Sequence, residues 1–241
     1  MLFLAAGSGA GAATKVPAFV SAAVADSHRP QADTRRDADR KPAIMLSLSG
    51  IKRGDRVAEL IPAQGYSTRL LSAAVGPTGH VYSINLATLN QRIKDQIKPV
   101  TDDPAYANVT VLDEDLTNLT VPEKVDLVWT AQNYHDFKNP GMFYADTEAM
   151  DKAIFAALKP GGLYVIIDHV AAPGSGTRDT GTLHRIDPEV VKKEVMEAGF
   201  KLVSESSELG NPNDPHTARV PGQGNIGDKS DKFFMKFQKP R

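Results

Sequence analysis

Histidine and aspartate residues in predicted loops are the strongest candidates for chemistry in this sequence. Four of the six histidines fall in such loops: His135, His169, His184 and His216. Two of the four are direct neighbours of an aspartate, in His135–Asp136 and Asp168–His169. A histidine can accept a proton near neutral pH, and an adjacent carboxylate can fix its tautomer. We therefore predict His135, Asp136, His169 and His184 as catalytic residues.

A cation site is the alternative interpretation of the same residues. Asp136 and Asp168 follow two consecutive predicted strands, and carboxylates in such places can bind magnesium. Additional histidines would suit zinc or another transition metal. The spacing is not diagnostic, and the sequence has no cysteine and no His-Glu-x-x-His motif. We therefore assign no metal ligands from the sequence.

The elements that must position these loops begin with a strand, a helix and a second strand over residues 56–85. A short apolar run at 56–60 is followed by a turn containing Gly65, an amphipathic segment at 66–75 and another apolar run at 80–84. The turn lies at the carboxyl end of a parallel strand, where N–H groups at a helix N-terminus bind ligands. Because Gly65 has no Cβ, we expect a ligand to approach the backbone there.

The remaining pattern predicts a three-layer α/β Rossmann-like fold. Further strands are predicted at residues 108–112, 125–130, 163–167, 200–208 and 232–239, and further helices at 31–48, 86–97, 146–158 and 188–198. The sheet should be mostly parallel and seven-stranded, with an antiparallel edge formed by the last two strands. Trp129 is assigned to the core. One domain is expected over residues 31–241, and the pattern alone predicts a solvated helix at its start.

Composition limits the classes of partner. The chain has 241 residues, of which 41% are hydrophobic, so it can bury a large core. Its formal net charge of −1, without a basic run, predicts a small-molecule partner and no nucleic acid. No segment reaches the length of a membrane span, so stable membrane insertion is not expected.

The N-terminal segment at residues 1–30 is either signal-like or a flexible tail. Residues 1–14 are apolar and end in small residues, as a secretory signal does, but they lack a basic start. Residues 15–30 are predicted to be a linker. The location is predicted to be periplasmic or secreted if this segment is a signal, and otherwise cytoplasmic.

Six motifs together resemble a known family. They are residues 40–43, 50–60, 133–137, 158–162, 183–187 and 211–217, within a resemblance that covers roughly residues 33–240. The chain resembles the class I S-adenosylmethionine-dependent methyltransferases, and within them a bacterial group described as predicted methyltransferases. The resemblance implies that S-adenosylmethionine is the cofactor and that residues 31–50 form a helical lid over its pocket.

The same resemblance implies the residues that surround the cofactor: Glu59, Gly65, Asn85 and Asp115. Two glycine positions of the family motif are occupied by Ile61 and Ala63 in this chain. Asn85 stands where the family has an acidic residue on the ribose, so it offers a neutral bond in place of a charge-assisted one.

The function predicted from this resemblance is methyl transfer from S-adenosylmethionine to a small-molecule acceptor. His135 or His169 would be the base, and Arg185 would anchor an anionic acceptor. The altered glycine pattern, Asn85 and the signal-like segment leave two alternatives open. One is an exported binding protein with this fold and no methyl-transfer activity, and the other is a metal-assisted hydrolase that uses the histidine and aspartate edge.

Overall fold

The computed structural model describes residues 14–141, 143–220 and 226–241. The predicted signal-like segment, apart from Thr14, lies outside the described residues. Within the described ranges, every helix is too short or too polar to span a bilayer.

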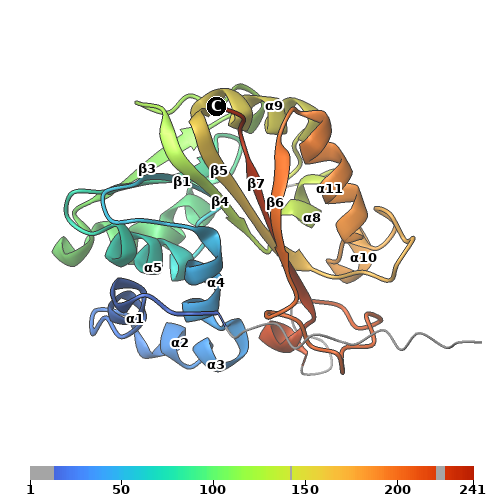
Figure 1. Cartoon of the computed structure of the whole chain (residues 1–241), viewed down its shortest axis with the longest axis horizontal. Helices are drawn as coiled ribbons and strands as arrows, with labels where there is room; N and C mark the ends of the chain where they lie inside the picture. Colours follow the sequence, from blue (N-terminus) through green and yellow to red (C-terminus); the bar gives the residue numbers. More distant parts are fainter. Residues whose placement is uncertain (1–13, 142, 221–225) are drawn as a thin grey trace, which may run out of the picture.

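A seven-stranded sheet forms the centre of the molecule, in the order β3-β2-β1-β4-β5-β7-β6 (Figure 1). The strands are β1 (Arg56–Leu60), β2 (His80–Leu86), β3 (Val109–Glu114), β4 (Val125–Ala131), β5 (Leu158–His169), β6 (Lys201–Ser206) and β7 (Lys232–Gln238). Strands β1 to β5 pair in parallel, and β7 runs antiparallel to both of its neighbours. The predicted α/β class and antiparallel edge are therefore confirmed.

Helices cover both faces of this sheet (Figure 1). They are α1 (Ala18–Val24), α2 (Gln31–Thr34), α3 (Asp37–Arg40), α4 (Pro42–Ser49), α5 (Tyr66–Val75), α6 (Gln91–Lys94), α7 (Lys98–Thr101), α8 (Tyr134–Phe137), α9 (Thr147–Ala157), α10 (Thr180–Leu183) and α11 (Pro188–Glu197). Asp187 caps α11 through the N–H of Glu189, and Pro188 occupies the first helical position, as the sequence predicts.

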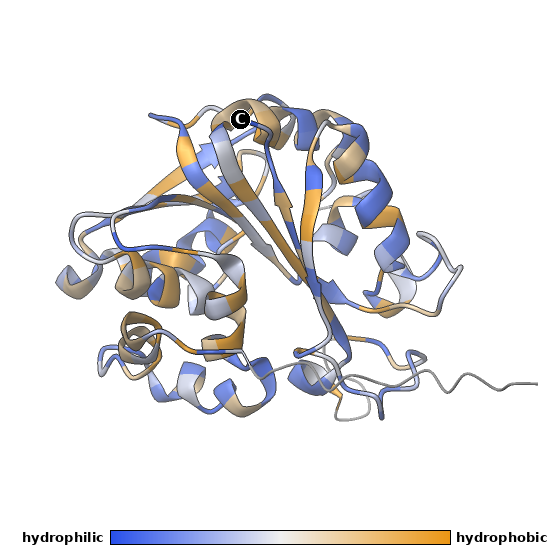
Figure 2. Cartoon of the chain, in the orientation of Figure 1, coloured by the Kyte–Doolittle hydropathy of each residue, from blue (hydrophilic) through white to orange (hydrophobic). Residues whose placement is uncertain are grey.

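Alternate residues of a strand point to opposite sides of the sheet. Because helices cover both sides, the central strands carry apolar residues on both faces. Val57 and Trp129 pack with Leu71 of α5 on one face, where α1 and α4 extend the layer. Ala58 and Val128 belong to the cluster on the other face, with α9 and α11. Leu71 is completely buried, and burial of such a side chain stabilises the fold by about 1.5–3 kcal/mol. Figure 2 shows the apolar residues concentrated along the strands.

Two helix predictions are wrong in their length. Residues 31–48 form three short helices because Lys41 takes a left-handed conformation (φ 51°) before Pro42, whose ring restricts the residue in front of it. Residues 86–97 contain the short helix α6 and the 3-10 helix η1 (Asp95–Ile97), because β2 continues to Leu86 and Asn90 caps a new start. Short helices thus replace a continuous lid and a continuous crossover helix.

Residues 15–30, predicted as a linker, contain α1. Val20 and Ala23 are buried on one face of this helix and belong to the same cluster as α5. The N-terminal part of the described chain is therefore packed on the domain.

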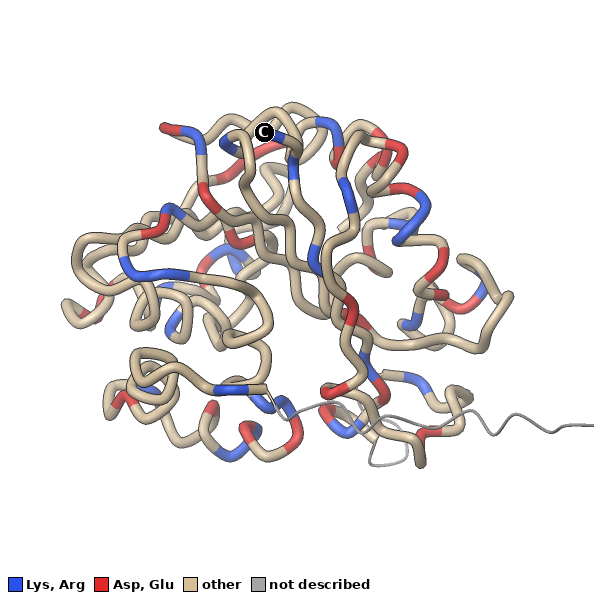
Figure 3. Tube along the Cα trace, in the orientation of Figure 1, with Lys and Arg blue, Asp and Glu red and all other residues tan. Residues whose placement is uncertain are grey.

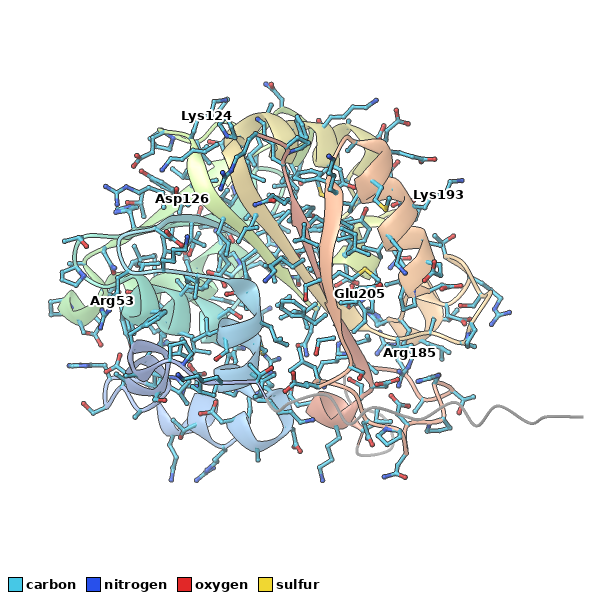
Figure 4. All side chains as sticks on the ribbon, viewed as in Figure 1. Arg53, Lys124, Asp126, Arg185, Lys193 and Glu205 are labelled. Atoms are coloured by element: carbon cyan, nitrogen blue, oxygen red, sulfur yellow. The ribbon has the colours of Figure 1, made fainter. Side chains whose placement is uncertain are left out.

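The helices α2 and α3 lie next to the loop between β6 and β7, near the carboxyl ends of the parallel strands (Figure 1). This loop contains the short helix η4 (Gly227–Lys229), which contacts α3. Figure 4 labels Lys124 and Asp126 near the opposite end of the sheet and Arg185 toward the carboxyl end. The candidate site lies between the strand ends and this cover.

Candidate active site

The turn between β1 and α5 has positive φ angles at three positions, of which only Gly65 is a glycine. Ile61 (φ 55°), Ala63 (φ 48°) and Gly65 (φ 81°) all have positive φ angles. Such angles are uncommon for residues other than glycine and exceptional for a β-branched one. Strain of this kind costs about 1–3 kcal/mol per residue and is concentrated at functional sites.

On the side where a Cβ would be, Gly65 packs against other side chains of the protein. A Cβ at this position would lie 2.3 Å from Cγ2 of Val100 and 3.0 Å from Cδ1 of Ile97. The expectation that a ligand uses this space is therefore wrong, because the segment before and within α7 fills it. Any contact of Gly65 with a ligand would have to use another side of the turn.

A cavity of about 260 Å³ opens above the end of β1, and we call it the Glu59 cavity. It is lined by Arg36, Arg40, Glu59, Leu60, Ile61, Pro62, Ala63, Gln64, Tyr66, Ser67, Trp129, Ala131, Gln132 and Asn133. Oε2 of Glu59 accepts hydrogen bonds from the hydroxyls of Thr68 (2.6 Å) and Ser83 (3.0 Å). Burial raises the pKa of Glu59 to about 7, although these two bonds oppose the shift.

Trp129 lines this cavity and also packs in the apolar core. Its indole Nε1 is buried and has no hydrogen-bond partner among the described residues. An unpaired buried donor costs about 1–3 kcal/mol. The sequence assigned Trp129 to the core only, since its position in a buried strand gave no signal for its second role.

Two arginines of the N-terminal helices cover the Glu59 cavity. Asp228 binds Nε of Arg36 (2.6 Å) and Nε of Arg40 (2.7 Å), which ties α3 to η4. Arg40 also donates to Oε1 of Gln132 (2.7 Å) and stacks on the Tyr66 ring at 4.5 Å. Figure 3 shows positive and negative residues interleaved on these segments. The lid at residues 31–50 remains a prediction, and these contacts support it.

A second cavity of about 290 Å³ lies beside the first, and we call it the histidine cavity. It is lined by Arg36, Arg40, Gln132, His135, Asp136, His169, His184, Val220, Gly227 and Asp228. The two cavities share Arg36, Arg40 and Gln132. All four residues predicted to be catalytic line this single space, although their roles stay predictions.

The end of β5 and the start of α8 hold the buried histidine pair. Asp168 is fully buried and accepts from Nδ1 of His135 (2.8 Å) and from the backbone N–H groups of His135 and His169 (2.8 Å each). Nδ1 of His169 lies 2.7 Å from Oγ of Ser230. The sequence expectation that an aspartate orients a histidine is met by Asp168 and His135, which come from different strand ends.

The two buried histidines differ in charge. Burial alone would lower the pKa of His135, but Asp168 and Asp136 raise it to about 10. Burial and the positive charges of His135 and Lys232 lower the pKa of His169 well below its usual value. The pKa of His184 is also lowered, mainly by burial. The neighbouring carboxylates thus favour the protonated form of His135, whereas burial favours the neutral form of His169.

Asn85 and Asp115 lie apart from the residues that line the Glu59 cavity. Asn85 is buried, and its Nδ2 lies 3.5 Å from Oδ1 of Asp113. Asp115 is exposed and accepts from the N–H (2.9 Å) and hydroxyl (2.8 Å) of Thr117, as the cap of η3 (Leu116–Asn118). Near these strand ends, Ile61, Leu86, Leu89 and Leu116 belong to one buried cluster.

The structure differs from the sequence predictions for Arg185 and His216. The guanidinium of Arg185 is fully buried and bonds Asp214 (2.8 Å) and the carbonyls of Val170 and Ala218 (2.9 Å each), so Arg185 as an anchor for a ligand is wrong. His216 pairs with Asp231 at 2.8 Å and is absent from the described lining of the histidine cavity. Three of the four loop histidines therefore converge.

Comparisons with known proteins agree with this architecture. No family model matches the chain. A protein-L-isoaspartate O-methyltransferase from Ignicoccus hospitalis is 37% identical over 71 residues, which cover 29% of this chain and 32% of that protein. The chain thus matches about a third of the length of that curated relative.

Two solved structures extend the likeness to most of the chain. A SAM-dependent methyltransferase from Aquifex aeolicus superposes with a TM-score of 0.62 at 17% identity, over 86% of this chain and 95% of that one. Fibrillarin from Aeropyrum pernix, with natively bound S-adenosyl-L-methionine, superposes with a TM-score of 0.52 at 21% identity. The match covers 84% of this chain and 76% of the fibrillarin chain.

The chain has the class I S-adenosylmethionine-dependent methyltransferase fold. The resemblance found in the sequence is confirmed at this level. In this fold the ends of β1 and β4 hold the Glu59 cavity, and the ends of β4 and β5 hold the histidine cavity. The narrower bacterial group stays a prediction.

Proposed function

We propose that this protein transfers the methyl group of S-adenosylmethionine to a small-molecule acceptor. The observation that carries the proposal is the juxtaposition of two cavities at the carboxyl edge of a methyltransferase fold. One is built around a buried carboxylate and the other around histidines, and they share Arg36, Arg40 and Gln132. Cofactor and acceptor would each occupy one of them.

The Glu59 cavity suits the amino-acid end of the cofactor. A ligand ammonium near Glu59 would favour the ionised carboxylate, whose pKa in the free protein is about 7. Arg36 and Arg40 supply positive charge for a ligand carboxylate. The nucleoside end would extend past Ile61 toward Asn85 and Asp115, which remain proposed cofactor contacts, as does Gly65.

The histidine cavity suits the acceptor and its proton. In the transfer, the acceptor oxygen or nitrogen forms a bond to the methyl carbon while the carbon–sulfur bond breaks and its electron pair stays on sulfur. The acceptor proton passes to His169, whose Nδ1 is occupied by Ser230 and whose other ring nitrogen is Nε2. His135, Asp136 and His184 line the same space and would orient the acceptor.

Isothermal titration calorimetry with S-adenosylmethionine and S-adenosylhomocysteine tests the proposal. We expect both ligands to bind, and we expect Glu59→Gln to weaken both because the cavity loses its negative charge. A lack of binding at about 1 mM ligand, equivalent to less than about 4 kcal/mol of binding energy, would defeat the proposal.

Turnover separates a methyltransferase from a binding protein. Purified protein with S-adenosylmethionine and a panel of phenol, alcohol and amine acceptors should release S-adenosylhomocysteine, detected by mass spectrometry. Binding without release across all acceptor classes would instead favour the exported binding protein.

A further inference from the structure

Three side chains in the histidine cavity place one ligand atom each at the corners of a nearly equilateral triangle. Nε2 of His135 lies 3.3 Å from Oδ1 of Asp136 and 3.3 Å from Nδ1 of His184. Nδ1 of His184 lies 3.2 Å from the same Oδ1 of Asp136. Metal–ligand bonds of about 2.0–2.1 Å at tetrahedral angles separate neighbouring ligand atoms by about 3.3–3.4 Å. The triangle therefore has the size of one face of a tetrahedral metal site.

Asp168 supplies the outer contact that such a site requires. Its Oδ1 lies 2.8 Å from Nδ1 of His135, so the Nδ1 proton points away from the triangle, and a bound ion would replace the second ring proton, on Nε2. Histidines that bind metals almost always donate their second N–H to a carboxylate, carbonyl or water. Backbone N–H groups of His135 and His169 hold the Asp168 carboxylate in turn.

The fold brings the third ligand into place with some strain. His184 takes a left-handed conformation (φ 53°) at the end of α10, which is uncommon for a residue with a side chain. Asn139 joins α10 to α8, because its Oδ1 accepts from Thr180 (2.7 Å) and its Nδ2 donates to the carbonyl of His135 (3.2 Å). Gly181 lies directly against Asn139, with 3.2 Å from a Cβ position to Oδ1. These contacts fix the distance between the two ligand segments.

We propose that His135, Asp136 and His184 bind a divalent transition-metal ion. Two imidazoles and a carboxylate suit zinc, iron(II), cobalt(II), nickel(II) or manganese(II), whereas magnesium and calcium prefer oxygen ligands alone. Three protein ligands leave an open position, which distinguishes a catalytic from a structural metal site. The open position faces a cavity of about 290 Å³ that also contains His169.

The role of the ion in catalysis rests on the proposed function. Bound at the open position, the acceptor hydroxyl or amine would be held between the ion and His169, beside the Glu59 cavity. Coordination polarises such a group and eases the loss of its proton. The acceptor class is therefore a compound whose reacting oxygen or nitrogen can coordinate a metal. Metal binding itself stands without this step.

Arg219 acts as a competitor for the proposed site. One of its guanidinium nitrogens lies 2.7 Å from Nε2 of His184, and because a guanidinium can only donate, Nε2 is the acceptor. The ring proton of neutral His184 is then on Nδ1, inside the triangle. Coordination through Nδ1 places this proton on Nε2, so the exposed Arg219 must swing away. Removal of Arg219 should therefore strengthen metal binding.

Metal binding is tested on the full chain without any activity assay. Protein treated with a chelator and dialysed is titrated with zinc and with cobalt(II), by calorimetry and by visible absorption of the cobalt form. We expect one ion per chain, and a cobalt spectrum of four- or five-coordinate geometry. Metal analysis of the purified protein should show the same stoichiometry.

Variants locate the site. His184→Ala and Asp136→Asn, which alter partly exposed side chains, should abolish the one-ion stoichiometry, whereas Asp168→Asn should weaken binding about 10–100-fold. His216→Ala is the matched control, since His216 pairs with Asp231 outside the triangle, and it should bind metal as the wild type does. Arg219→Gln should bind metal more tightly than the wild type.

Two results would overturn the inference. One is a lack of stoichiometric binding of either ion, and the other is binding that His216→Ala removes and His184→Ala does not. Calorimetry with S-adenosylhomocysteine on the metal-free protein keeps the two proposals apart. If the cofactor binds and the metal does not, only the metal site fails, and the reverse result defeats only the methyltransferase proposal.

Discussion

The carboxyl edge of the sheet has two halves, formed by the ends of β1, β4 and β5 and by the ends of β2 and β3. They differ in the surroundings of their polar groups. At the ends of β1, β4 and β5, buried polar groups such as Glu59, Trp129 and His169 face cavities. At the ends of β2 and β3, Asn85 faces Asp113 and Asp115 caps η3 at the surface. Near these strand ends, Leu86, Leu89 and Leu116 belong to the buried core cluster.

This difference indicates where the protein gives up stability for function. A buried polar group without full hydrogen bonding destabilises a fold, so such groups persist mainly where a ligand completes them. The β1–β4–β5 half contains the polar groups that destabilise the fold in this way. In the β2–β3 half, polar groups form hydrogen bonds with nearby residues. We conclude that polar recognition of ligands is concentrated in the first half.

The largest expected difference between the halves is in the free energy of unfolding after an Asp→Asn substitution in each half. Asp168→Asn removes a buried charge that accepts from His135 and from two backbone N–H groups, so it should lower the free energy of unfolding by about 3–5 kcal/mol. Asp115→Asn, at an exposed cap, should cost less than about 1 kcal/mol. Urea denaturation measures both, and equal effects would contradict the comparison.

Glu59→Gln should stabilise the ligand-free protein at high pH. An acid whose pKa is raised by folding binds its proton more tightly in the folded state, so the free energy of unfolding falls as the pH rises from 4.5 to about 7. The neutral glutamine avoids this loss. The variant should exceed the wild type by up to about 3 kcal/mol at pH 8 and match it below pH 4.5. Urea denaturation at several pH values checks this, and a difference that does not vary with pH would count against a buried, protonated Glu59.

Asn85→Asp probes the other half, and its effect on stability should be smaller than those of Asp168→Asn and Glu59→Gln. A carboxylate at this position would face Asp113, whose Oδ1 lies 3.5 Å from the present Nδ2, and should cost about 1 kcal/mol in the free protein. If the ribose reaches β2, S-adenosylhomocysteine should bind a few-fold more tightly, because a charged acceptor makes the stronger hydrogen bond. Calorimetry measures the affinity of the variant for S-adenosylhomocysteine. Unchanged or weaker affinity would contradict the assignment of Asn85 to the cofactor site.

The sequence predicted the sheet well because its signals are local. The apolar strands, the cap at Asp187 and the breaker at Gly76–Pro77 act within a few residues. The mostly parallel sheet and its antiparallel edge followed from the resemblance and from the alternation of elements, whereas the order of the strands was not predicted. The short helices were missed because Pro42 and Asn90 override the apolar period around them.

The site was only partly predictable because its contacts join distant segments. Strand ends indicated His135, His169 and Asp168, since parallel strands bring their carboxyl ends to one edge. The arginine cover depends on Asp228, which is 188 positions beyond Arg40 and carries no local signal. Arg185 was misassigned because its partner Asp214 lies in another loop. Neither pairing has a period or spacing that a sequence reveals.

A crystal structure of the protein soaked with S-adenosylhomocysteine tests the central claim most directly. We predict that the amino-acid end of the ligand lies within hydrogen-bonding distance of Glu59 and that its sulfur lies at the border of the histidine cavity. A ligand bound on another face, or a Glu59 cavity closed by the protein's own side chains at saturating ligand, would contradict the account.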